Sequence, residues 1–431
     1  MLVLIILTAV LFFGLFYILP RKPFKSLLWN LIIIGIWSVT WLLLFKYELI
    51  LTGSTTGTYG SDATYYYEAM HAGYFSNNPS QAISAYYNQL YIWYGIIILK
   101  TSPFFSIIWV KLGNIVLLLY VVSIMYLMLY RAGVPRRIIA FVCLFAGLNG
   151  IVTWMCIRNL KDTLFLFLLV GNCFLATGYY FNFKKWKRNK KIIYLFVLLA
   201  ISAVLATILR DVRQWAYIIP WLILFCLLLK TLLDNKSFER LFPILGIGAV
   251  FLLPIIVPAM IGTDVIINFK SYASTIGLGA RTGLSLIGGI FVSFLRFIIG
   301  PGPFRAMMGN DIFLVTTNIG NMLIFLGSLM WWLVLPLMVL RIRELLRISI
   351  KEIIIAAPFL LYVFIYIYAY QGSVETRFRS VLYILSMLLW GLTYAYYKPF
   401  KHRANNSQLA YIVCALFVFL SGTIVTFLTL S

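Results

Sequence analysis

The segment GSDATYYYEAMHAG, at residues 60–73, carries the side chains best suited to proton transfer. Asp62 stands near its start, and Glu68 and His71 follow. A carboxylate can act as a general base on a hydroxyl group, or it can hold a metal ion. On a helix, Glu68 and His71 would share a face at i and i+3. We expect Asp62, Glu68 and His71 to be the catalytic candidates; the alternative for Asp62 is a helix N-cap.

Three later segments place basic side chains beside acids: RNLKD at 158–162, LRDVRQW at 209–215 and QGSVETRFRSVLYIL at 371–385. Arginine binds phosphate with a planar, permanently charged fork. Together with one residue of the segment 263–311, the candidates for binding phosphate are Arg158, Lys161, Arg210, Arg213, Arg305, Arg377 and Arg379. The neighbouring acids are Asp162, Asp211 and Glu375.

Each of these segments also has a plain structural interpretation. Arg158 and Asp162 are at i and i+4, as in an ordinary helix ion pair. Arg210 and Arg213 could extend toward lipid headgroups at the end of a span. The tyrosines Tyr65–Tyr67 could stack on a sugar, or belong to the aromatic belt at a membrane surface.

The composition determines what kind of protein must position these residues. Of 431 residues, 63% are hydrophobic and 11% are charged, whereas soluble domains carry roughly 25% charged residues. Apolar runs near the ~20-residue length of a membrane-spanning helix recur along the chain. We therefore predict an all-α fold, a polytopic transmembrane helical bundle that forms a single integral membrane domain over residues 1–431.

The apolar runs predict about twelve spans. They fall near 1–19, 28–50, 104–130, 138–157, 163–183, 192–209, 215–233, 241–262, 312–340, 353–371, 378–397 and 409–430. If 86–100 and 283–300 also cross, there are fourteen. Two large outer loops are expected, 51–103 with interfacial helices and 263–311.

The net charge of +23 indicates the orientation. Most basic residues fall in six loops on one side, including KKWKRNKK at 184–191, and the positive-inside rule makes that side cytoplasmic. The candidate site residues then lie on the extracytoplasmic side, where buried or interfacial charge is a functional hypothesis by default. No soluble segment is long enough for a basic domain that binds nucleic acid.

The remaining metal and redox residues are few. The five cysteines lie in or beside apolar runs and are expected to be packing residues, and two histidines are too few for a metal site. The sequence therefore identifies no cofactor, although a divalent cation held by a carboxylate stays open.

These motifs resemble the C-type multi-span membrane glycosyltransferases that use lipid-linked sugars. In that family a carboxylate in the first outer loop is the catalytic base or a metal ligand, which matches Asp62. A late E-x-R-aromatic signature resembles Glu375–Arg379, and Asn149 followed by RNLKD is similar too. The first loop departs from the family in having a lone Asp rather than a paired acidic motif. The resemblance implies a sugar donor on a polyprenyl phosphate or pyrophosphate, in contact with membrane lipids.

A neighbouring resemblance is to O-antigen and exopolysaccharide polymerases, which share the outer arginines and a large outer loop. A flippase or transporter for such a lipid, and a non-catalytic scaffold of an envelope machine, are further alternatives. The expected location is a bacterial inner (plasma) membrane, with the active site facing away from the cytoplasm.

Overall fold

The computed structural model describes residues 1–54, 56–86, 88–183, 193, 223, 294–300, 302–303, 317–369, 379–396 and 404–428. Within these ranges the chain forms α-helices joined by turns, without a strand, which confirms the predicted all-α class. The chain divides into two compact units. The first comprises Met1–Val170, Leu295–Lys351 and Val374–Ser431, and the second Gly171–Phe294 and Glu352–Ser373.

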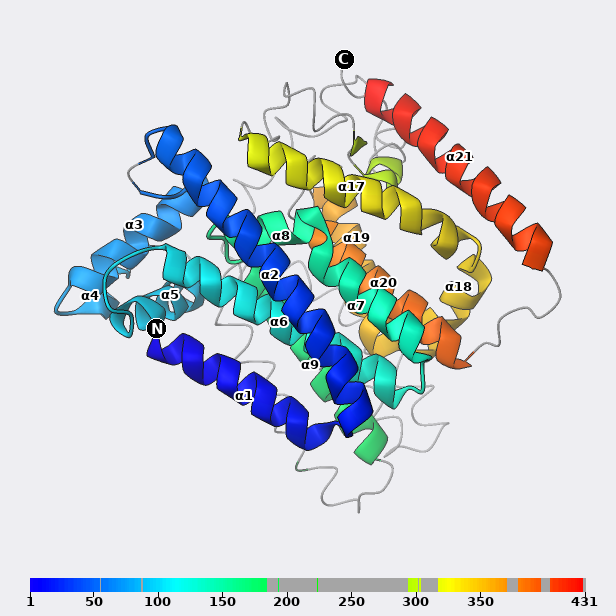
Figure 1. Cartoon of the computed structure of the whole chain (residues 1–431), viewed down its shortest axis with the longest axis horizontal. Coiled ribbons are helices and arrows are strands. Elements are labelled where there is room, and N and C mark those ends of the chain that lie inside the picture. Colours follow the sequence, from blue (N-terminus) through cyan, green and yellow to red (C-terminus); the bar gives the residue numbers. More distant parts are fainter. Residues whose placement is uncertain are drawn as a thin grey trace, which may run out of the picture. The chain divides into compact units, whose positions relative to one another are not determined.

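The helices follow the apolar runs of the sequence (Figure 1). They are α1 (Leu2–Ile18), α2 (Arg21–Leu51), α3 (Ser61–Phe75), α4 (Pro79–Ala82), α5 (Gln89–Lys100), α6 (Ile108–Arg131), α7 (Arg136–Leu148), α8 (Gly150–Ile157), α9 (Asp162–Phe183), α17 (Asn318–Val339), α18 (Ile342–Lys351), α19 (Ile353–Ala369), α20 (Arg379–Tyr396) and α21 (Ala404–Leu428).

Three of these helices are long and apolar enough to cross a membrane: α2, α6 and α17. The bent pair α7 and α8 makes a fourth if it counts as one span. This supports membrane association, but within the described residues the number is smaller than the twelve predicted. Three of the predicted spans, 192–209, 215–233 and 241–262, lie outside the described residues, apart from the single positions 193 and 223.

The span predicted at 138–157 is broken at Asn149 in the structure. α7 ends there and α8 begins one residue later, with a bend of 46° between them. The side chain of Asn149 caps α8, accepting hydrogen bonds from the backbone amides of Ile151 (3.0 Å) and Val152 (3.4 Å). A side-chain oxygen that satisfies the free amides of a helix start stabilises such a break inside an apolar run.

α8 packs directly against α17 through two glycines. A Cβ atom at Gly150 would overlap the backbone carbonyl of Leu323, and one at Gly327 would overlap the backbone nitrogen of Ile151. Asn149 adds a hydrogen bond from its Nδ2 to the carbonyl oxygen of Gly327, at 3.1 Å. Small residues let two helix backbones approach this closely, as in membrane helix pairs.

α2 is joined to both partners of this pair. The indole of Trp37 donates to Thr153 Oγ1 on α8, at 3.0 Å. Near the C-terminal end of α2, the Glu48 carboxylate accepts hydrogen bonds from the first backbone amides of α17, those of Asn318 (2.6 Å) and Ile319 (3.1 Å). A carboxylate at a helix N-terminus is favoured by the helix dipole as well as by these bonds. Glu48 therefore has a structural role in starting α17.

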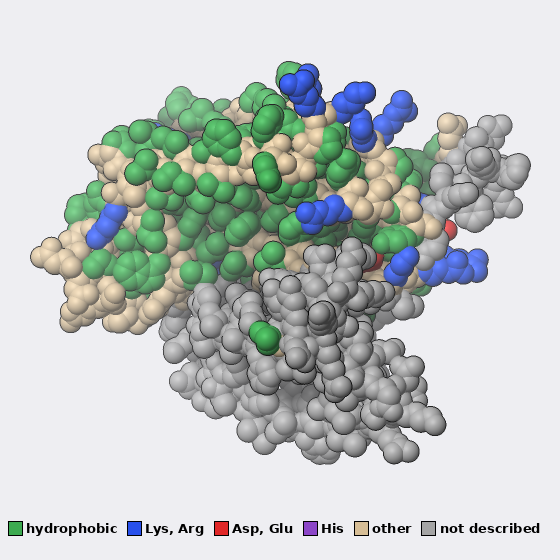
Figure 2. Space-filling model, turned by 90° about the horizontal axis from the view of Figure 1, so that it is seen from below, with side chains coloured by type: hydrophobic (Ala, Val, Ile, Leu, Met, Phe, Trp, Pro, Cys, Tyr) green, Lys and Arg blue, Asp and Glu red, His purple; other side chains and the backbone are tan. Residues whose placement is uncertain are grey.

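The surface of the described helices is strongly apolar. Figure 2 shows one face, where hydrophobic side chains form a continuous area and most of the visible lysines and arginines lie toward its edge. Large exposed hydrophobic side chains occur along the outer faces of α1, α2 and α21, for example Phe13, Trp29 and Phe417. A soluble monomer rarely exposes so large an apolar area, so this surface agrees with a bilayer environment.

We predict that Gly150→Ala destabilises the fold strongly. The added methyl group meets a backbone carbonyl that cannot move independently of α17, and overpacking of this kind costs on the order of 3 kcal/mol. Thermal unfolding of the detergent-solubilised protein measures the effect. Gly35→Ala is the matched control, because a Cβ at Gly35 of α2 has nothing within 4 Å. Equal stability of the two variants would contradict the close α8–α17 contact.

Candidate functional site

Asp62 lies in the first turn of α3 with an exposed side chain. The N-cap of α3 is Gly60, with φ of 89°, a residue without a side chain. The N-cap interpretation of Asp62 is therefore wrong. A carboxylate in the first turn of a helix is favoured by the helix dipole. Its exposure leaves it accessible to a ligand.

Arg158 reaches the start of α3 from the far end of α8. It is the C-cap residue of α8, and its guanidinium lies 5.3 Å from the ring of Trp154. A Cβ built on Gly60 would be 2.7 Å from Arg158 Nη2, so the guanidinium rests against the Gly60 backbone. Two segments about a hundred residues apart thus bring a guanidinium to the turn that carries Asp62.

The helical i, i+4 spacing predicted for Arg158 and Asp162 is wrong, because the two residues do not lie on one helix. Arg158 ends α8, Asp162 starts α9, and Asn159 between them is left-handed, with φ of 61°. Asp162 is 3% exposed, whereas Lys161 is half-buried. The RNLKD motif is therefore a turn that separates a half-buried arginine from a buried acid.

A buried hydrogen-bond network fixes this turn to the first outer loop. Tyr91 of α5 donates its hydroxyl to Asn159 Oδ1 at 3.0 Å, and Asn159 Nδ2 donates to the carbonyl of Ala63 in α3 at 3.3 Å. Asn114 of α6 donates to the Tyr91 hydroxyl at 3.2 Å and to the Cys156 carbonyl at 3.3 Å. Burial raises the pKa of Tyr91 well above its usual value, and nearby Asp162 adds to this effect. The phenol therefore stays neutral and keeps its proton to donate.

Lys111 holds the glycine-rich strap before α3, which is the loop GSTTGTYG at residues 53–60. This lysine at the start of α6 is 3% exposed, and its Nζ donates to the carbonyl of Gly57 at 2.8 Å. It also lies 4.7 Å from the ring centre of Phe45, a cation–π contact. A lone lysine at the edge of an apolar run gave a weak signal in the sequence, and its partner, a backbone carbonyl, gave none.

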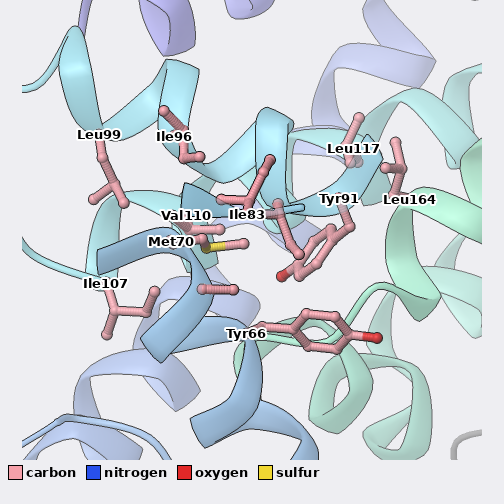
Figure 3. Close-up of a cluster of buried hydrophobic side chains, with 12 residues drawn as sticks. Tyr66, Met70, Ile83, Tyr91, Ile96, Leu99, Ile107, Val110, Leu117 and Leu164 are labelled. Carbon is pink, nitrogen blue, oxygen red and sulfur yellow. The ribbon is translucent and has the colours of Figure 1, made fainter. Parts of the chain in front are cut away.

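Aromatic packing explains the tyrosines of α3. Tyr66 contacts Tyr91 at a ring distance of 5.1 Å, and its hydroxyl accepts from Asn88 Nδ2 at 3.0 Å. Figure 3 shows Tyr66 of α3 and Tyr91 of α5 in one cluster with Met70 and Ile96. This cluster of α3, α5 and α6 anchors the first outer loop, so Tyr66 is a packing residue and does not form a sugar platform.

Glu68 and His71 lie away from Asp62. His71 is nine positions along α3 from Asp62, about 13 Å at the helical rise. Its ring contacts Phe75 at 4.7 Å and Phe105 at 5.1 Å. Glu68 is exposed on the same helix. One small reacting group cannot contact both Asp62 and His71, so the geometry leaves Asp62 as the acid beside Arg158.

Arg379 is fully buried at the start of α20, with its Nη2 donating to the carbonyl of Arg296 at 3.1 Å. The other candidates fall outside the described residues: Arg210, Asp211, Arg213, Arg305, Glu375 and Arg377. Among the residues that are described, no three His, Cys, Asp or Glu side chains lie together in a group that could hold a metal ion. Cys143, Cys156 and Cys173 are buried and unpaired, as expected of packing residues.

We predict that Asn159→Ala detaches the first outer loop from α8. The change removes two buried hydrogen bonds and places alanine in a left-handed conformation, at a combined cost of about 2–4 kcal/mol. Asn159→Gly keeps the backbone conformation and should lose less. Limited proteolysis between α2 and α5, together with thermal unfolding, reports the detachment. If cleavage in both variants equals that of the unmodified chain, the network does not hold the loop.

Comparison with known proteins identifies no relative of this chain. The chain matches no known family model, no curated protein and no solved structure. The function is therefore argued from the described side chains, above all from Asp62, Arg158 and the contacts that hold them.

Proposed function

We propose that this protein is an integral membrane glycosyltransferase of cell-envelope polysaccharide or glycolipid assembly. It transfers a sugar from a polyprenyl-phosphate-linked donor on the extracytoplasmic face of a bacterial inner membrane. The observation that carries the proposal is the guanidinium of Arg158 against Gly60, at the turn where α3 presents the exposed carboxylate of Asp62.

The two side chains suit the two halves of the reaction. The Asp62 carboxylate takes the proton of an acceptor hydroxyl as that oxygen forms a bond to the anomeric carbon of the donor sugar. The bond from this carbon to the phosphate oxygen breaks, and the phosphate leaves with the electron pair. Arg158 neutralises the charge that grows on the leaving phosphate, which is where an electrostatic contact accelerates such a step.

The surrounding structure suits a lipid substrate. Exposed apolar side chains along α1, α2 and α21 suit a bilayer. A polyprenyl tail would stay in that bilayer while its charged head meets Arg158. The half-buried Lys161 is a second basic group on the same turn. The proposal keeps about twelve spans and places Arg210, Arg213, Arg305 and Arg377 as further phosphate contacts; these four are predictions from the sequence.

An O-antigen-type polymerase would use the same Asp62 and Arg158, because it also breaks a sugar–phosphate bond. The two activities differ in their products: a transferase adds one sugar, and a polymerase gives a ladder of repeat units. A flippase moves the lipid without chemistry and therefore has no need of Asp62. Product analysis thus separates all three.

We predict that Asp62→Asn abolishes sugar transfer while the protein still folds and enters the membrane. The amide keeps the shape of the side chain but cannot accept the proton, and loss of a general base lowers rates about 10²–10⁴-fold. Membranes carrying the variant are assayed for transfer from a polyprenyl-phosphate-linked sugar donor. Glu68→Gln, on the same helix and equally exposed, is the control and should retain activity. Normal product from Asp62→Asn would eliminate the catalytic role.

Gly60→Ala tests the Arg158 contact while both charged residues, Asp62 and Arg158, stay unsubstituted. Both Gly60 and Gly53 have positive φ, 89° and 74°, so alanine strains the backbone at either position. Only at Gly60 does the new Cβ meet Arg158, since Gly53 has nothing within 4 Å. We expect Gly60→Ala to lower kcat/KM at least tenfold relative to Gly53→Ala. Equal rates would show that the position of Arg158 does not matter for transfer.

A further inference from the structure

The guanidinium of Arg379 is buried without enough acceptors. The side chain is 0% exposed, and Nη2 alone has a hydrogen bond, to the carbonyl oxygen of Arg296. Nε and Nη1 have no acceptor in the part of the chain that the structure describes. Arginine stays protonated in proteins, so it carries its full charge in this apolar interior.

A charge in this position is costly unless an anion accompanies it. Buried cations are normally paired and fully hydrogen-bonded, because desolvation otherwise outweighs what the fold gains from them. A carbonyl oxygen satisfies one donor but supplies no negative charge. The unfilled donors of Arg379 therefore point to a missing anionic partner.

The backbone at Gly300 lies close to the Arg379 guanidinium. At Gly300, with φ of 95°, a Cβ would lie 3.3 Å from Arg379 Nη1 and 3.5 Å from the Tyr383 hydroxyl. Trp331 stacks on Tyr383 at 4.4 Å, and its indole donates to the carbonyl of Ile298 at 2.6 Å. These contacts hold the backbone before Gly300 in place and orient Nη1 beside it.

Arg379 lies beside the same helix that carries Arg158. Ser380, its neighbour on α20, contacts Met155 of α8, with 3.0 Å between Ser380 Oγ and Met155 Sδ. Met155 and Arg158 are three residues apart, which places them on one face at the end of α8. Arg379 is therefore the fully buried cation and Arg158 the half-buried cation of one region.

We propose that Arg379 binds a phosphate oxygen of the membrane lipid on which the protein acts, through Nη1. This deepens the proposed function and rests on it. The chemistry is that of a phosphate ester, and the source is a lipid, because the buried side chains that follow Arg379 on α20, such as Val381 and Leu382, and Trp331 of α17 are apolar, as a polyprenyl chain is. Among the described residues, Arg379 has no anionic partner, and the lipid phosphate would supply one.

Stability gives the first test, because the sign of the change in Tm on substitution distinguishes a ligand site from a structural ion pair. Arg379→Met removes an unpaired buried charge and replaces it with an apolar side chain of similar length. The ligand-free variant should melt at the same or a higher temperature than the unmodified chain. A large drop in Tm would show that Arg379 already has its anion within the fold and would overturn the proposal.

Binding gives the second test, on the full chain in detergent micelles. The probes are polyprenyl phosphate, the uncharged polyprenol of equal chain length, and inorganic phosphate. The unmodified chain should bind polyprenyl phosphate at least tenfold more tightly than polyprenol, and bound lipid phosphate should raise its Tm. Arg379→Met should lose this preference. Arg379→Lys should keep part of it, because lysine retains the positive charge but lacks the planar guanidinium group.

Arg341→Gln is the matched control, since Arg341 already has a partner in Thr393 Oγ1 at 2.9 Å and packs on Tyr394. It should keep the full preference for the phosphate lipid. If Arg379→Met, folded and monodisperse, still prefers polyprenyl phosphate over polyprenol tenfold, the proposal is wrong. A Tm rise with inorganic phosphate equal to that with the lipid would overturn the lipid source.

The two proposals fail separately. If Asp62→Asn still transfers sugar while Arg379→Met loses phosphate-dependent binding, the chemistry is wrong and the lipid site stands. If Asp62→Asn is inactive and Arg379→Met binds as before, the transferase stands and this site falls.

Discussion

The backbone contact between α8 and α17 is the constraint on which the rest of the described site depends. Gly150 and Gly327 let the two helices touch, and the Asn149 side chain seals the break that lets α8 turn toward α17. Since all eight residues of α8 are buried, the helix is held along its whole length. Its end is therefore a fixed point, and Arg158 at that end has a defined position relative to Gly60 and α3.

From this fixed point, the first outer loop is positioned by bonds to backbone atoms. Asn159 accepts from Tyr91 and donates to the Ala63 carbonyl, and Lys111 donates to the carbonyl of Gly57. Each of these bonds fastens a stretch of α3, or of the strap before it, to the helices underneath. A loop tied on both sides of Asp62 gives an exposed carboxylate with a restricted position, and catalysis requires such restriction.

The sequence predicted the helices well, because continuous apolar runs specify spanning or buried helices largely independently of their neighbours. α2, α6 and α20 lie close to their predicted ranges. It did not predict the break at Asn149, although an Asn-Gly pair inside an apolar run is a signal for one. It named Asp62, Arg158 and Arg379 as candidates for one site but did not predict the contacts that hold them. The bonds that position the segments of Asp62 and Arg158, from Tyr91, Asn114, Asn159 and Lys111, join parts of the chain far apart in sequence and end largely on backbone carbonyls, which have no sequence pattern.

The two described arginines illustrate why depth in the fold decides what a charge can do. Arg158 rests on a ring and on a glycine backbone near the surface, where its charge is partly solvated and the cost of keeping it is small. Arg379 is fully enclosed, so the same charge is costly there unless an anion enters. A phosphate lipid that reaches both would exchange hydration of its head for two guanidinium groups while its tail stays among apolar side chains. The strongest contact would then form at the buried end, because electrostatic attraction grows as the surroundings become less polar.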